Sequence, residues 1–267
     1  MARFRHGLPS RLAETKLILS SLAEQIQWPS CPDIPPLTGE DVHVWATSLA
    51  VAPAVLETFA ATLSPDETAR ANKFKFDKHR NRFIAGRGAL RAILARYLNT
   101  AAADLRFAYS ENGKPALTGD FGGIHFNLAH TEDLALVAVT RIGLIGVDVE
   151  AVRPVKNVDE LVARFFSKRE NELFQKVPEE QKPAAFFNLW TRKEALLKAT
   201  GEGITRSLSL VEVSFLPGEP ARLLAISGDE KKAGEWSVRD FSPVAGFVGA
   251  IAIRARDVRL SRWKWER

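Results

Sequence analysis

The stretch Gly146-Val147-Asp148-Val149-Glu150 sets two acids among apolar residues at the end of a predicted buried strand, Ile142 to Val149. Side chains two residues apart on a strand point to the same side, so Asp148 and Glu150 can share one ligand while the valines pack the other way. The same pattern also fits an edge strand that holds its acids in solvent. The acidic pair alone leaves both interpretations open.

A second element favours the shared ligand. The sequence predicts a helix at about 184–200, whose residues Trp190, Glu194 and Lys198 fall on one face. Together with the acidic pair they form a cluster of carboxylates with an ammonium beside it, which suits a hard divalent cation and a phosphate. Lys198 could instead pair with Glu194 one turn away, a surface contact worth only about 0.3 to 0.5 kcal/mol. That pairing gives no reason for Trp190 on the same face.

Composition narrows the class of partner. The 267 residues suffice for one large domain or two medium ones, and the formal net charge of +5 favours an anionic partner such as nucleic acid, a phosphorylated cofactor or an acidic protein. Cys31 is the only cysteine, which excludes an intramolecular disulfide and suggests a reducing cytoplasm. No apolar run reaches the roughly 18 to 20 residues of a membrane span, and no secretory signal pattern is found. We therefore expect a cytoplasmic protein without a membrane partner.

Helical and strand-like segments alternate in blocks along the chain. We expect four regions, an N-terminal extension at 1–40, an N-terminal half at 41–141, a C-terminal half at 142–257 and a tail at 258–267. The extension combines an amphipathic helix with a proline-rich connector, and capping boxes at Ser64 and Ser167 predict helix starts. Strands are predicted at 42–47, 105–109, 124–129, 134–140, 142–149, 209–216, 223–227, 236–241 and 247–254. Helices followed by strands, twice over, predict an α+β fold of two similar halves with a site in the crevice between them.

Basic residues crowd the segment 70–91, in which Asp77 is the only acid. They are Arg70, Lys73, Lys75, Lys78, Arg80, Arg82, Arg87 and Arg91. An apolar stripe in the later part predicts a core-packing helix with a basic rim. The rim could simply be solvated, or it could be an anion-binding wall, because so much uncompensated charge repels itself unless an anion binds.

Two further residues carry weak signals when taken singly. His130 lies at a strand end, and Lys114 lies in a tight turn between Gly113 and Pro115. A lone histidine is more often structural, and a lysine in a turn is usually solvated. The sequence has no glycine-rich phosphate loop, no dinucleotide fingerprint and no paired cysteines for zinc, and no nucleophile triad stands out.

The order of five motifs is more specific than any one of them. Along the chain follow Gly113-Lys114-Pro115, Phe126-Asn127-Leu128-Ala129-His130, Gly146 to Glu150, Phe165 to Glu170, and Trp190 to Lys198. In order and spacing, over roughly residues 60 to 205, the series resembles the surfactin-synthetase-activating type of 4′-phosphopantetheinyl transferase. The resemblance implies that family's fold, with two pseudo-symmetric α/β halves and the active site at their interface.

The resemblance also implies a reaction. The phosphopantetheine arm of coenzyme A is transferred to a serine of an apo acyl or peptidyl carrier protein, and adenosine 3′,5′-bisphosphate is released. Magnesium is the implied metal, although manganese accepts the same oxygen ligands. Attack on a diphosphate accumulates negative charge, so a metal and a cation at the leaving oxygen suit this chemistry. We expect a monomer that binds coenzyme A and carrier proteins and no nucleic acid.

Catalytic and metal-binding roles carry over to the matching positions. Asp148, Glu150 and Glu194 match the magnesium-binding acids of the family. Glu194 also matches the residue that takes the serine proton, directly or through a water. Lys198 matches the lysine that stabilises or protonates the departing phosphate of coenzyme A.

Nucleotide contacts carry over in the same way. His130, at the 3′-phosphate, and Lys114 match groups that hold the nucleotide, while Arg82 and Arg70 fall where relatives place basic contacts to coenzyme A. One position departs from the pattern, because relatives usually carry serine before the motif histidine and this chain has Ala129. The contact that the serine hydroxyl makes with the nucleotide in relatives is then lost, or a backbone amide makes it instead. The affinity for the nucleotide is the property that this change affects.

The alternative is a basic binding module, either for nucleic acid or for coenzyme A and carrier proteins without catalysis. Nucleic-acid binding would be tight and sensitive to salt. It gives no reason for an acidic cluster, which would repel a phosphate backbone. The sequence does not indicate which carrier proteins are served.

Overall fold

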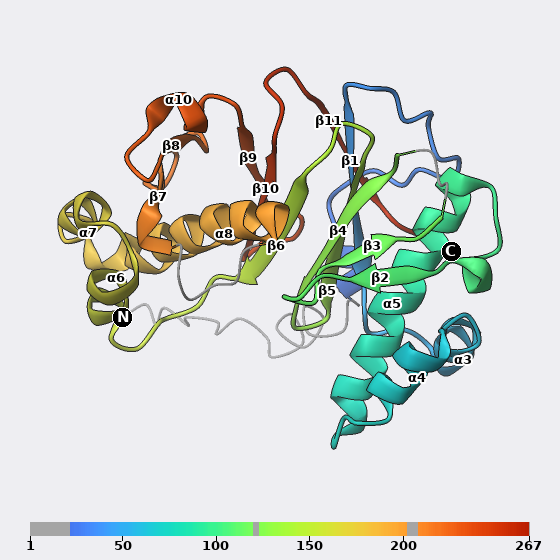
Figure 1. The fold of residues 1–267 in the computed structure, drawn as a ribbon. Coiled ribbons are helices and arrows are strands. Elements are labelled where there is room, and N and C mark those ends of the chain that lie inside the picture. Colours follow the sequence, from blue (N-terminus) through green and yellow to red (C-terminus); the bar gives the residue numbers. More distant parts are fainter. Residues whose placement is uncertain (1–21, 120–122, 202–207, 267) are drawn as a thin grey trace, which may run out of the picture.

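The protein folds into two halves that lie side by side, each with a β-sheet and one long helix against it (Figure 1). The structure is a computed structural model that describes residues 22–119, 123–201 and 208–266. This arrangement confirms the predicted fold class. Most of the expected N-terminal helix lies outside the described residues, and its described part is α2 (Leu22–Gln25). None of the described helices has the length and apolar character needed to cross a membrane.

The N-terminal half is built on a four-stranded sheet in the order β11-β1-β5-β4. Its strands β1 (Asp41–Ser48), β5 (Leu134–Thr140) and β4 (His125–Thr131) pair antiparallel. Strand β5 is buried along its whole length, which explains its nearly continuous apolar sequence. Helix α5 (Asp77–Leu98) packs Leu90, Ile93 and Leu94 against this sheet. Shorter elements complete the half, namely α3 (Pro53–Ala60), α4 (Pro65–Ala71) and the hairpin of β2 (Phe107–Tyr109) and β3 (Pro115–Leu117).

The segment expected as a tail, 258–267, contains a strand of this sheet. Strand β11 (Arg259–Lys264) pairs in parallel with β1. Arg259 Nε donates a hydrogen bond of 2.6 Å to Asp41 Oδ1, which fastens the start of the strand. Residues 259–264 therefore belong to the N-terminal sheet and not to a separate tail. No local sequence pattern predicts this pairing, because the partner strand lies near the other end of the chain.

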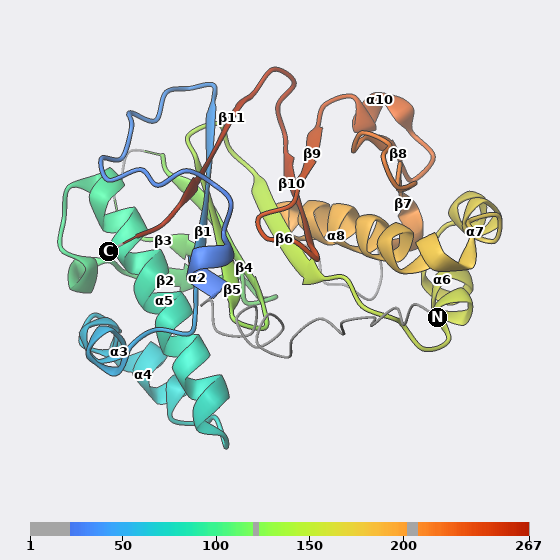
Figure 2. The same cartoon turned by 180° about the vertical axis from the view of Figure 1, so that it is seen from behind.

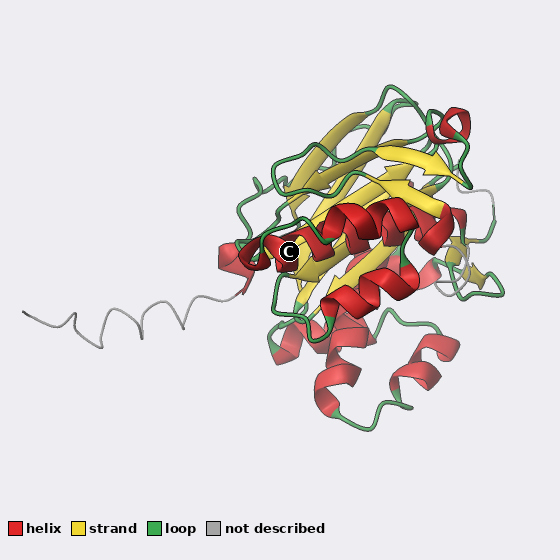
Figure 3. Ribbon diagram, turned by 90° about the vertical axis from the view of Figure 1, so that its left-hand side faces the viewer, coloured by secondary structure: helices red, strands yellow, loops and turns green. Residues whose placement is uncertain are grey.

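The C-terminal half is built on a three-stranded antiparallel sheet in the order β6-β10-β9. Its strands are β6 (Ile145–Ala151), β10 (Phe247–Ile253) and β9 (Ser237–Phe241). Helix α8 (Lys182–Thr200) crosses this sheet, and Figure 3 shows the helices lying over the strands. Smaller elements surround it, namely α6 (Val158–Phe165), α7 (Lys168–Phe174), β7 (Val211–Val213), β8 (Leu223–Ile226) and α10 (Glu230–Ala233).

Local signals set the helix ends as predicted. Capping boxes at Ser64 with Glu67 and at Ser167 with Glu170 start α4 and α7, where each side chain satisfies a backbone amide that has no partner inside the helix. Helix α8 ends at Gly201, which adopts the left-handed conformation at φ 77°.

The two halves meet at strands β4 and β6, which are neighbours in space in Figures 1 and 2. The buried side chain of Asn127, on β4, accepts a hydrogen bond of 2.9 Å from the backbone amide of Val147, on β6. Helix α8 lies so close to β6 that a Cβ at Gly146 would be 2.0 Å from the carbonyl oxygen of Ala195. The acidic cluster is therefore assembled where β4, β6 and α8 come together.

Candidate active site

Asp148 lies inside the site, not on an exposed strand face. The residue is 5% exposed, while Val147 and Val149 pack into the apolar core on the other side of β6 as expected. Its Oδ1 accepts a 2.6 Å hydrogen bond from Lys198 Nζ, and its Oδ2 is buried without a hydrogen-bond partner. Burial raises the pKa of Asp148 to about 6, although the Lys198 ammonium opposes the shift.

Glu194 faces the same region from α8. It is 4% exposed, and its Oε1 is buried and lacks a hydrogen-bond partner. Burial, together with the negative charge of Asp148, raises the pKa of Glu194 to about 7. Lys198 pairs with Asp148 and not with Glu194 one turn away, so the simple surface pair considered from the sequence is not formed.

Glu150 is the third acid and is less buried. Its Oε2 accepts hydrogen bonds from Thr131 Oγ1 at 3.2 Å and from Arg153 Nη1 at 3.3 Å. Thr131 belongs to β4, so this contact again links the two halves. Asp148 and Glu150 thus share one side of β6, as the alternation of the strand predicted.

These acids have the donor chemistry of a magnesium site. Mg²⁺ prefers carboxylate oxygens and keeps several waters or phosphate oxygens, so a few carboxylates are enough. Two buried carboxylate oxygens without partners, on Asp148 and Glu194, are what such a cation would satisfy. In the described part of the chain, no three His, Cys, Asp or Glu side chains are arranged to hold a metal ion as they stand. Lys198, Thr131 and Arg153 now occupy oxygens of Asp148 and Glu150.

A cavity of about 370 Å³ opens beside this cluster. Glu194 and Lys198 line it from α8, Asn127 from β4, and Gly113 and Lys114 from the turn between β2 and β3. It therefore holds groups from both halves, which agrees with a site at their interface.

An adjoining cavity of about 200 Å³ collects the basic residues. Arg70, Arg82 and His130 line it, and it shares Gly113, Pro115 and Leu128 with the first cavity. Arg82 is fixed by a 2.7 Å contact with Asp133. Burial, followed by the charges of Lys198 and Arg82, lowers the pKa of His130, so its ring stays neutral more readily than a free histidine.

The basic run contains one further cavity residue that the sequence did not single out. Arg87 lines the basic cavity, is 6% exposed and has a buried Nη1 without a hydrogen-bond partner. Arg91, by contrast, is fully buried against Glu67. The charge of the run is thus partly compensated by Glu67 and Asp133, acids from outside the run, and only some of its members form the expected wall.

Ala129, the position at which the chain departs from the motif, is buried. Its side chain is 3% exposed and belongs to the apolar cluster that contains Val147 and Val149. The methyl group therefore faces the core. Only the backbone of Ala129 could contact a nucleotide, and this contact stays a prediction.

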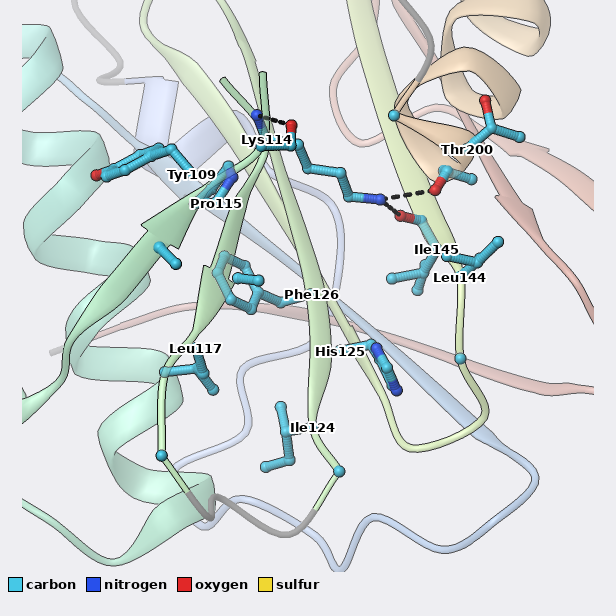
Figure 4. A pocket seen from close by; sticks show the side chains of 18 residues that line it. Tyr109, Lys114, Pro115, Leu117, Ile124, His125, Phe126, Leu144, Ile145 and Thr200 are labelled. Atoms are coloured by element: carbon cyan, nitrogen blue, oxygen red, sulfur yellow. Dashed lines mark hydrogen bonds between the residues drawn. The ribbon is translucent and has the colours of Figure 1, made fainter. Parts of the chain in front are cut away.

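Lys114 reaches across to the C-terminal half (Figure 4). Its Nζ donates to the carbonyl oxygens of Ala199 at 2.8 Å and Ile145 at 3.1 Å. Burial lowers the pKa of Lys114 to about 8. The side chain of Lys114 also lines a third cavity, of about 580 Å³, which Figure 4 shows. This cavity lies between β2, β3, the start of β4 and the end of α8.

Comparisons with known proteins point to one family. A family model described as the 4′-phosphopantetheinyl transferase superfamily matches residues 144–252, and one for the N-terminal part of 4′-phosphopantetheinyl transferase matches residues 50–141. The chain is 43% identical over 231 residues to the 4′-phosphopantetheinyl transferase HetI of Nostoc sp., covering 86% of this chain and 94% of that protein. It is 30% identical over 158 residues to the 4′-phosphopantetheinyl transferase Sfp of Bacillus subtilis, covering 59% of this chain and 68% of that protein.

A similar solved structure is the holo-[acyl-carrier-protein] synthase of Thermotoga maritima, with 22% sequence identity over 42% of this chain and 62% of that one. Its TM-score of 0.31 is too low to bear on the arrangement of the two halves.

Proposed function

The chain belongs to the 4′-phosphopantetheinyl transferase superfamily, and from this premise we propose that it transfers the phosphopantetheine group of coenzyme A to a serine of an apo acyl or peptidyl carrier protein. Adenosine 3′,5′-bisphosphate is the other product. The observation that supports this most directly is the pair of buried carboxylates, Asp148 and Glu194, each with one oxygen that lacks a partner. They lie beside a cavity that shares three lining residues with a basic one.

In the proposed step, the serine oxygen forms a bond to the phosphorus that carries the pantetheine arm. The bond from that phosphorus to the oxygen of the departing bisphosphate breaks. Glu194 takes the serine proton, for which its pKa of about 7 is well placed, since a general base works best when its pKa lies near the operating pH. Lys198, with 32% of its side chain exposed, presents its ammonium to the departing phosphate.

Asp148, Glu150 and Glu194 are the residues that would hold magnesium. When bound, the cation would offset the charge that develops on the diphosphate oxygens. The chain's own contribution is to bury one oxygen of Asp148 and one of Glu194 without a protein partner, which leaves these two oxygens available to a cation.

The basic cavity is the proposed nucleotide site. Arg70, Arg82 and His130 line it with Arg87, whose buried Nη1 is available for a phosphate oxygen. Arginine suits this role because its planar fork matches phosphate geometry.

One incubation tests the proposal. Purified protein, an apo carrier protein, coenzyme A and magnesium are combined, and intact-mass measurement follows the carrier. The expected result is a mass gain of one phosphopantetheine group, which disappears with a serine-to-alanine carrier. Binding of coenzyme A without any mass gain across fatty-acid, polyketide and peptide carriers would support a non-catalytic module instead.

His130→Ala is expected to raise the KM for coenzyme A by about tenfold while changing kcat little, because it removes a ground-state contact to the nucleotide. Initial rates at varied coenzyme A concentration measure both constants. His79→Ala, on the exposed side of α5, is the matched control and should match the unsubstituted protein. An unchanged KM for His130→Ala would remove this residue from the nucleotide site.

Thermal stability should depend on pH and magnesium through the buried acids. The carboxyl groups of Asp148 and Glu194 titrate near 4 when exposed, but their pKa values rise to about 6 and about 7 in the folded protein. Between about pH 4 and pH 7 the folded state therefore binds more protons than the unfolded state, so the free energy of unfolding falls as pH rises through this range. Without divalent ions we expect Tm to drop between about pH 4 and pH 8, and magnesium to raise Tm more at the upper end.

Differential scanning fluorimetry at several pH values, with and without magnesium, checks this expectation. The double variant Asp148→Asn, Glu194→Gln should lose both the pH slope and the magnesium effect. If it kept the full magnesium effect, the cation would bind elsewhere.

A further inference from the structure

The turn between β2 and β3 makes its own contacts with the C-terminal half. Gly113 adopts φ 77°, and its amide donates to the carbonyl of Ser110 at 2.8 Å. Ser110 and Lys114 are joined by hydrogen bonds in both directions, from the Ser110 amide to the Lys114 carbonyl and from the Lys114 amide to the Ser110 hydroxyl. These bonds fix the direction in which the side chains of Asn112 and Lys114 leave the turn.

Both side chains reach the carboxyl end of α8. Lys114 Nζ donates to the carbonyl of Ala199, and Asn112 Nδ2 donates to the carbonyl of Gly201 at 2.8 Å. The last carbonyls of a helix have no partner within the helix, and a cation there is favoured by the helix dipole. The turn therefore supplies, from the other half of the protein, the donors that the end of α8 lacks.

The same ammonium also contacts β6. Lys114 Nζ donates to the carbonyl of Ile145, the first residue of this strand (Figure 4). One side chain thus joins the end of the helix that carries Glu194 and Lys198 to the start of the strand that carries Asp148.

We propose that the Asn112-Gly113-Lys114 turn is a clamp that positions α8 on β6, so that Lys114 serves transfer by holding the site together and is not a nucleotide contact. Two of the three N–H groups of its ammonium are taken by the carbonyls of the C-terminal half. The basic cavity proposed for the nucleotide is lined by Gly113 and Pro115 from this turn and by no atom of Lys114. The expected effect on kcat rests on the proposed function, whereas the contacts of the clamp do not.

The kinetic test separates a clamp from a nucleotide ligand. Lys114→Met keeps the length of the side chain and removes its donors. Without them we expect the acids to be displaced by about 1 Å, which lowers kcat by on the order of 10- to 100-fold. The KM for coenzyme A, and the Kd from titration calorimetry, should stay within about threefold. Lys114→Arg should recover most of kcat, because it restores donors and charge. Lys231→Met, an exposed lysine of α10, is the matched control.

A second readout needs no transfer reaction. In hydrogen-exchange mass spectrometry, Lys114→Met and, to a smaller extent, Asn112→Ala should speed exchange in residues 196–201 and leave the first turns of α8 unchanged. If the protein transferred nothing but exchange rose at the end of α8, the proposed function would fail and the clamp would stand. A Kd for coenzyme A raised tenfold or more, with kcat and exchange unchanged, would make Lys114 a nucleotide ligand and overturn the clamp.

Discussion

Glu194→Gln is expected to lower kcat for carrier modification by about 10²- to 10⁴-fold, the range that a general base contributes. The substitution keeps the size of the side chain and removes its ability to take a proton. It also removes a negative charge from the oxygen that the fold buries without a partner. The KM for coenzyme A should change little, because Glu194 does not line the basic cavity that is proposed for the nucleotide. Initial rates at saturating carrier protein measure the effect.

Glu172→Gln is the matched control, since Glu172 is exposed on α7 and makes only a long surface contact with Lys168. It should transfer at the unsubstituted rate. The folded fraction of each variant is checked by circular dichroism, because Glu194→Gln relieves a buried charge and should not destabilise the metal-free protein. Transfer at the unsubstituted rate by Glu194→Gln would show that another group accepts the serine proton.

The residues of the acidic cluster could be predicted because each sits in a local pattern. Strand alternation places Asp148 and Glu150 on one side, and helical spacing places Glu194 and Lys198 on one face. Their mutual arrangement depends on how α8 crosses β6, which no local pattern encodes. The sequence therefore does not predict the bond between Lys198 and Asp148, whereas helical spacing does allow Lys198 to pair with Glu194.

The basic run shows the same limit more clearly. Counting charges within 70–91 suggested that they were uncompensated, but Glu67 from α4 and Asp133 from the turn after β4 lie against them. Arg91 is buried and structural, whereas Arg87 lines the basic cavity, although the two lie four residues apart on the same face of α5. Both arginines contact Glu67, Arg91 at 2.7 Å and Arg87 at 3.7 Å, and only the tertiary structure makes this difference. The parallel pairing of β11 with β1 escaped prediction for the same reason, since it joins opposite ends of the chain.

Gly146 is the small residue at the start of the acidic motif, and a small residue there is a sequence signal for close packing. Its importance becomes clear in the packing of α8. A Cβ at this position would lie 2.0 Å from the carbonyl oxygen of Ala195 and 2.4 Å from the amide nitrogen of Ala199. Both are backbone atoms, so no change of side-chain rotamer on α8 can make room.

Gly146→Ala is therefore expected to push α8 away from β6 and to lower the free energy of unfolding by about 3 kcal/mol or more, the upper part of the range for overpacked cores. Transfer activity should fall further than the loss of folded protein explains, because Glu194 and Lys198 leave their places beside Asp148. Urea denaturation measures the first effect, and kcat per folded molecule, at a temperature where the variant is still folded, measures the second. Ligand titration with coenzyme A should be affected least, since the basic cavity belongs mainly to the N-terminal half.

Gly39→Ala is the matched control for this substitution, because a Cβ at Gly39 would meet no heavy atom within 4 Å. It adds the same methyl group and should leave stability and kcat close to those of the unsubstituted protein. A Gly146→Ala protein with unchanged stability would mean that α8 and β6 do not pack backbone against backbone. A destabilised protein with full kcat per folded molecule would instead separate the packing of α8 from the placement of Glu194 and Lys198, and would remove the reason for expecting the glycine to matter to catalysis.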